Sequence, residues 1–202
     1  MKSCFLSCLL ALIAFTLLAC PASAAVTIAF YSHDLRLIDG ANTDFPHAFV
    51  TLDGTDSGGA LVHAEYGFSA RNIFVNVLWE PVNGALDVGP LSATYMAEAT
   101  RHFSLVLTDA QYRAVLEVVH KWATWPQPSY DIDTHNCVTF VKEIALAVGL
   151  AVSDDKRFVR DPDGFLDDMR LRNIVFLGPA TAPVPANTGD TQKGVSQLHA
   201  RP

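Results

Sequence analysis

The sequence predicts an α+β domain in which an antiparallel sheet packs against a helix that carries a cysteine. Two observations lead to this prediction. From residue 25 to about residue 88, stretches rich in β-branched and aromatic residues alternate with glycine-containing turns, a pattern typical of strands. After residue 108, apolar residues recur at helical spacing and are bounded by helix-capping residues.

Six segments of the sequence are expected to form strands. Asp53-Gly54 and Ser57-Gly58-Gly59 are turn signals that separate two of them, which we expect to pair as a hairpin. The final expected strand follows the last helix. The strand segments are 26–31, 47–52, 60–66, 73–79, 103–107 and 174–177.

Three helices are expected in the second half of the chain. Thr108 and Gln111 form a capping-box pattern, and the apolar residues that follow share one helical face as far as about residue 122. A second helix runs from about Cys137 to Val148, with Gly149 at the expected C-terminal cap. A third, short helix is expected over 163–171.

The two ends of the chain have different compositions from the domain between them. Residues 1–24 resemble an export signal, with an apolar run from Leu9 to Leu18 and the small-residue cleavage site Ala22-Ser23-Ala24. Ten apolar residues are too few to span a bilayer. We therefore expect a secreted or periplasmic domain over 25–178, followed by a disordered tail over 179–202. In a second interpretation Cys20 is lipidated as in bacterial lipoproteins, and only then is a membrane a partner.

Cleavage after Ala24 leaves 202 − 24 = 178 residues, and removal of Lys2 changes the formal charge from −7 to −8. This acidity argues against a nucleic-acid partner, which needs a clustered basic surface. Removal of the signal also leaves a single cysteine, Cys137, because Cys4, Cys8 and Cys20 all precede the cleavage site. A lone cysteine in an oxidising compartment is either a buried apolar side chain or a thiol kept free for chemistry.

The surroundings of Cys137 favour the second alternative. Asn136 is a good helix N-cap, which places Cys137 in the first helical turn, where backbone N–H groups lower a thiol pKa and stabilise an oxyanion. A thiol nucleophile also needs a base. His47 opens one strand of the expected hairpin and His63 lies in the next, so the two imidazoles are expected to lie within a few ångströms of each other.

These motifs resemble those of the circularly permuted papain-like proteins. The segments are His47-Ala-Phe-Val-Thr-Leu-Asp-Gly54, Leu61-Val-His63 and His135-Asn-Cys-Val-Thr-Phe-Val141. The superfamily includes lecithin:retinol acyltransferase-like enzymes, permuted relatives of NlpC-type cell-wall peptidases and PPPDE isopeptidases. The resemblance implies Cys137 as nucleophile, His47 as general base and His63 as the residue that orients it. Tyr130 resembles a tyrosine often found ahead of the N-C motif.

The resemblance implies an exported thiol hydrolase or acyltransferase that acts on an amide, isopeptide or ester bond. Cell-envelope peptides are the leading substrate class and acyl lipids the next. Tyr130 and His135 are possible substrate contacts. The alternatives are a non-catalytic envelope binding protein with the same fold, and a zinc hydrolase that uses Cys137, His47 and His63 as ligands. The leading hypothesis requires no cofactor and no metal, and it leaves the substrate and oligomeric state open.

Overall fold

The structure, a computed structural model, describes residues 25–33, 36–38, 41–44, 46–72 and 75–178. It confirms the α+β class. A five-stranded antiparallel sheet has the order β6-β5-β4-β1-β7. Its strands are β1 (Val26–His33), β4 (His47–Thr55), β5 (Leu61–Ala70), β6 (Gly84–Val88) and β7 (Thr100–Leu107). The short strands β2 (Arg36–Ile38) and β3 (Ala41–Asp44) pair only with each other.

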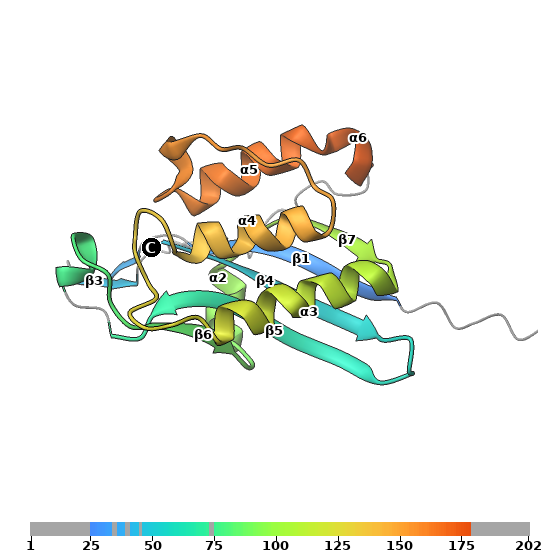
Figure 1. Cartoon of the computed structure of the whole chain (residues 1–202). Helices are drawn as coiled ribbons and strands as arrows, with labels where there is room; N and C mark the ends of the chain where they lie inside the picture. Colours follow the sequence, from blue (N-terminus) through green and yellow to red (C-terminus); the bar gives the residue numbers. More distant parts are fainter. Residues whose placement is uncertain (1–24, 34–35, 39–40, 45, 73–74, 179–202) are drawn as a thin grey trace, which may run out of the picture.

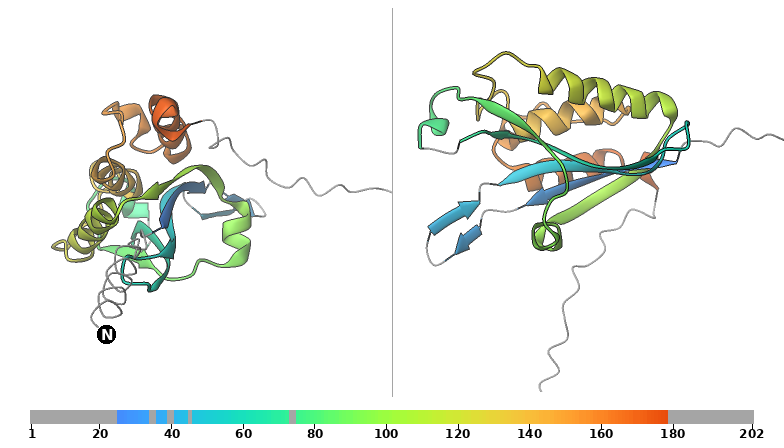
Figure 2. Two further views of the ribbon diagram at one scale, coloured as in Figure 1. Left: turned by 90° about the vertical axis from the view of Figure 1, so that its right-hand side faces the viewer. Right: turned by 90° about the horizontal axis from the view of Figure 1, so that it is seen from below.

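Helices cover the two faces of the sheet unequally (Figures 1 and 2). The long helices α3 (Asp109–Ala123), α4 (Cys137–Ala147) and α5 (Pro162–Arg172) lie on one face, and the short α2 (Ala93–Glu98) lies on the other. The remaining helical segments are the 3₁₀ turns η1 (Val75–Leu78) and η2 (Lys156–Phe158) and the short α6 (Ile174–Leu177). Among the described residues, the second face of the sheet is therefore covered by less helix than the first.

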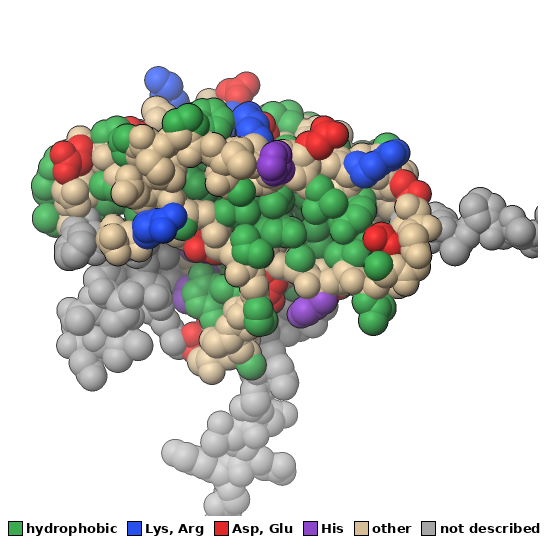
Figure 3. All heavy atoms as spheres, turned by 60° about the horizontal axis from the view of Figure 1, so that its bottom comes forward, with side chains coloured by type: hydrophobic (Ala, Val, Ile, Leu, Met, Phe, Trp, Pro, Cys, Tyr) green, Lys and Arg blue, Asp and Glu red, His purple; other side chains and the backbone are tan. Residues whose placement is uncertain are grey.

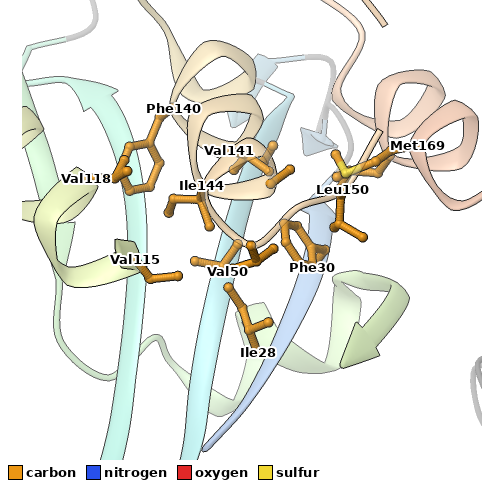
Figure 4. Close-up of a cluster of buried hydrophobic side chains, with 14 of the residues drawn as sticks. Ile28, Phe30, Val50, Val115, Val118, Phe140, Val141, Ile144, Leu150 and Met169 are labelled. Carbon is orange, nitrogen blue, oxygen red and sulfur yellow. The ribbon is translucent and has the colours of Figure 1, made fainter. Parts of the chain in front are cut away.

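The hydrophobic core lies between the sheet and its long helices (Figure 4). Alternate residues of β1 and β4, such as Ile28 and Val50, point toward apolar residues of α3 and α4, such as Val115 and Ile144. These side chains are fully buried, and burial of each contributes about 1.5–3 kcal/mol. Figure 3 shows further hydrophobic side chains gathered where α3 lies against the sheet. Strand alternation leaves the residues between these core positions on the opposite face.

The strands expected over 26–31, 47–52, 60–66 and 103–107 are confirmed, as are the helix over 163–171 and the capping box of Thr108 and Gln111 at the start of α3. Residues 1–24 and 179–202, where we expected an export signal and a disordered tail, lie outside the described residues.

Two expected strands are wrong. Within 73–79 the described residues form the 3₁₀ turn η1, in which Asn76 donates to Glu80 at 2.7 Å and Val77 alone is buried. Residues 174–177 form α6, since the Leu177 N–H donates to the carbonyl of Asn173 at 2.8 Å. Both segments form a local turn and do not pair with a neighbouring strand. A short apolar run is compatible with a strand or a helix, so it does not by itself predict strand pairing.

Candidate functional site

Cys137 is the first residue of α4, as the sequence predicts. Asn136 caps the helix: its side-chain oxygen accepts from the N–H of Thr139 at 3.0 Å, and the Thr139 hydroxyl accepts from the Asn136 N–H at 2.8 Å. The Asn136 amide nitrogen donates to the carbonyls of Ile132 and Val159 at 2.6 and 2.7 Å. The buried Asn136 therefore fixes the start of α4 to two neighbouring loops, and with it the position of Cys137.

The thiol of Cys137 is buried, with 6% of the residue exposed. Burial raises its pKa to about 11, although the backbone N–H groups of Ala48, Val138 and Cys137 itself point at the sulfur and lower it. The Asp87 carboxylate raises the pKa further. The sequence led us to expect a lowered thiol pKa, and this is wrong for the described conformation because desolvation of the thiolate outweighs the helix N-terminus.

His47 opens β4 and lies beside Asp87 rather than His63. Its Nε2 is 3.7 Å from Oδ2 of Asp87, which also accepts a hydrogen bond from the Ser69 hydroxyl at 2.5 Å. Burial lowers the pKa of His47, the Asp87 carboxylate raises it, and His33 lowers it. The imidazole is therefore neutral and able to accept a proton at neutral pH.

Gly67 makes the approach of His47 to Asp87 possible. In the register of the sheet, Phe49 of β4, Gly67 of β5 and Asp87 of β6 stand side by side, so their side chains share one face. A Cβ atom at position 67 would lie 2.4 Å from Nε2 of His47 and 3.3 Å from Oδ2 of Asp87. The imidazole thus passes over a position where any larger residue would displace it.

Cys137 and His47 approach the first residues of β4 from opposite faces of the sheet, and no hydrogen bond joins their side chains. The sulfur contacts the N–H of Ala48, the residue after His47. The imidazole stacks on Phe49, with ring centroids 6.1 Å apart, on the side of the strand that faces Asp87. In the described conformation the thiol lies near backbone amides that lower its pKa, and the imidazole is directed toward a carboxylate.

A cavity of about 580 Å³ adjoins His47, but not Cys137, and is lined by β4, β5, β6, the turn at 89–91, and Tyr95 of α2. His47, Gly67, Ser69 and Asp87 all form part of its wall. This size is typical of small-molecule and cofactor sites. The cavity gives a ligand access to His47 and Asp87.

His63 does not join the site, and the expectation that it lies near His47 is wrong. β4 and β5 are antiparallel, with Asp53 paired to His63 and Phe49 to Gly67, so His63 lies at the far end of the hairpin from His47. Its side chain is 71% exposed, and its Nδ1 is 2.5 Å from Oδ1 of Asp53. This hydrogen bond raises the pKa of His63. The interval of sixteen residues between the histidines places them at opposite ends of two long strands.

Tyr130 and His135 have different roles. Tyr130 lines the cavity, and its backbone bridges to Val82. Burial raises the pKa of Tyr130, so its hydroxyl remains protonated. His135 packs into an aromatic cluster: its ring stacks on Trp122 with centroids 3.8 Å apart, and Nδ1 lies 2.5 Å from the Ser129 carbonyl. Burial lowers the pKa of His135, which is consistent with a neutral packing residue.

Sequence reasoning missed Asp87, Ser69 and Gly67. A glycine inside an otherwise regular strand signals close approach of another group, and Gly67 in Glu65-Tyr66-Gly67-Phe68 was such a signal. Asp87 was missed because its strand, β6, is only five residues long and was not predicted.

Among the described residues, no group of three or more His, Cys, Asp or Glu side chains is arranged to hold a metal ion. None of the helices in that part of the chain is long and apolar enough to cross a membrane.

Comparison of the chain with protein-family models, with curated proteins and with solved structures finds no match.

Proposed function

We propose that the protein is a thiol-dependent hydrolase or acyltransferase of the permuted papain-like type, in which Cys137 is the nucleophile and His47 the base. The observation that carries the proposal is the position of the thiol. It lies at the N-terminus of α4, contacted by three backbone N–H groups, against the residue that follows His47. The order of a strand-borne histidine followed by a helix-borne cysteine agrees with the same type of fold.

The proposed chemistry starts from a neutral thiol and a neutral imidazole, because burial raises the pKa of Cys137 and lowers that of His47. As the sulfur attacks the carbonyl carbon of an amide or ester, His47 takes the thiol proton. The backbone amides at the start of α4 stabilise the oxyanion of the tetrahedral intermediate. His47 then protonates the leaving group, and water or an acceptor alcohol or amine releases the acyl group from sulfur.

Asp87 takes the role that the sequence assigned to His63. The carboxylate at 3.7 Å favours the imidazolium that forms during attack, and the Ser69 hydroxyl fixes the carboxylate. His47 must rotate toward the thiol for proton transfer. Catalytic hydrogen bonds are often long without substrate and tighten in the complex.

The burial of the thiol favours a second candidate, a binding protein that uses the cavity alone. Cys137 is 6% exposed and does not line the cavity. In that case Cys137 is a core residue, and His47 and Asp87 contact a ligand without chemistry.

Acylation by p-nitrophenyl acetate, followed by intact mass and peptide mapping, distinguishes the two functions. We expect one acetyl group on Cys137, no adduct in Cys137→Ala, and a rate at least about 100-fold lower in His47→Ala, the usual loss when a general base is removed. The matched control is His63→Ala, which removes the exposed histidine of the same hairpin and leaves the rate unchanged. If the acetyl group is found on another residue, or if Cys137 is acylated at the same rate in His47→Ala as in wild type, the result supports the binding protein instead.

A further inference from the structure

The cavity wall contains a buried acid that the proposed chemistry does not use. Glu65 of β5 lines the cavity and is 7% exposed. Its carboxylate accepts one hydrogen bond, from the backbone N–H of Leu91, in the turn that closes the same cavity. Among the described residues no side chain forms an ion pair with Glu65. Burial of an ionised carboxylate costs free energy unless a hydrogen-bond donor or a cation contacts it.

The described lining of the cavity is acidic and aromatic. Glu65 and Asp87 are its two acids, and it contains no Lys or Arg. Phe49 and Tyr95, with ring centroids 5.8 Å apart, form part of the wall. Two carboxylates without a basic side chain attract a cation and repel an anion, and aromatic faces attract an ammonium group further.

We infer that the cavity binds a protonated amine, with Glu65 as the residue that accepts its hydrogen bonds. This inference rests on the proposed function, for which it names the substrate class: an amide or ester with a cationic amine on the part that enters the cavity. Acyl groups that end in a carboxylate are excluded by Glu65 and Asp87.

The register of the sheet indicates how far the amine lies from His47. Glu65 is two residues before Gly67 on the same face of β5, a separation of about 7 Å along the strand. His47 lies over Gly67. A substrate amine that contacts Glu65 therefore lies about 7 Å along the strand from the position of the imidazole.

The alternative is that Glu65 only holds the turn at Leu91 in place. A test with simple probes separates the two roles. Binding of phenethylamine, its neutral isostere phenethyl alcohol, and the anion 3-phenylpropanoate is measured by calorimetry and by amide shifts in NMR spectra. The proteins are wild type, Glu65→Gln and the control Glu117→Gln, which changes an exposed acid on α3. Glutamine at position 65 retains an oxygen for the Leu91 N–H.

We expect the amine to bind at least about tenfold more tightly than the alcohol in wild type and in Glu117→Gln, the usual contribution of a hydrogen bond to a charged group. The anion binds most weakly, and the preference for the amine disappears in Glu65→Gln. Equal binding of amine and alcohol, no binding by any probe, or a preference that survives in Glu65→Gln overturns the inference.

The same measurements in Cys137→Ala separate this inference from the proposed function, because binding requires no thiol. If the wild-type protein prefers the amine but Cys137 is not acylated, the amine site is supported and the role of Cys137 as nucleophile is refuted. If Cys137 is acylated but the protein does not prefer the amine, the nucleophile is supported and the amine site is refuted.

Discussion

Two groups of serine, histidine and aspartate side chains lie among the described residues, and they differ in their access to the cavity at His47. In the first, His102 Nε2 lies 2.8 Å from the Ser32 hydroxyl and His102 Nδ1 lies 3.1 Å from Asp167. Ser32 also donates to Asp163 at 2.9 Å. In the second, the Ser69 hydroxyl donates to Asp87, which lies beside His47.

The His102 group holds the same three residue types as a catalytic triad, but the single hydroxyl proton of Ser32 goes to Asp163 rather than to the imidazole, and the serine and histidine lack access. Ser32 and His102 are 1% and 3% exposed, and both aspartates belong to α5, which packs on β1 and β7 at this point. The group thus fastens α5 to the sheet. The His47 group has weaker connectivity, yet it opens on the cavity and adjoins a thiol. The comparison teaches that access and a nucleophile, rather than a serine–histidine–aspartate arrangement, indicate a candidate site.

The largest expected effect is a loss of folding stability when the His102 group, rather than the His47 group, is disrupted. His102→Ala removes the buried imidazole that links Ser32 to Asp167 and leaves a cavity in its place, while the hydrogen bond from Ser32 to Asp163 remains. We expect a loss of about 3 kcal/mol in the free energy of unfolding, measured by urea denaturation. Acylation of Cys137 below the unfolding transition is expected to match wild type. A stable His102→Ala protein with lost acylation would reverse the roles that we assign to the two histidines.

A smaller effect is expected from Gly67→Ala. The new methyl group would meet Nε2 of His47 at 2.4 Å and push the imidazole away from Asp87. We expect a rate of Cys137 acylation at least about tenfold lower, because misplacement of a catalytic group by about 1 Å can cost up to 100-fold. Gly58→Ala is the control, since its methyl group meets only the flexible Asp56 side chain, at 3.2 Å. Equal rates in the two variants contradict this role for Gly67.

The smallest expected effect concerns pH. Burial lowers the pKa of His47 and Asp87 raises it, so Asp87→Asn lowers this pKa further. The neutral base then persists to lower pH, and the acid limb of the acylation profile shifts to more acidic pH. Asp53→Asn, at the exposed His63 pair, leaves the profile unchanged. A shift toward higher pH, or the same shift in both variants, contradicts the role of Asp87.

Much of the framework around the site was predictable because it depends on short-range signals. Asn136 and Thr139 cap α4 through residues three apart, and Thr108 and Gln111 do the same for α3. Alternation and turn glycines located β4 and β5. The same local signals placed Cys137 in a first helical turn. They failed over 73–79 and 174–177, where short apolar runs lack a strand partner.

The composition of the site was decided by tertiary structure. The register of β4, β5 and β6 brings Gly67 and Asp87 to His47 and takes His63 to the far end of the hairpin. Burial of the thiol raises a pKa that its helical position alone would lower. The sequence by itself thus determined which segments form helices and strands and where the cysteine stands in its helix. Which side chains meet it, and in which protonation state, depends on long-range pairing and on exclusion of water, which no local pattern encodes.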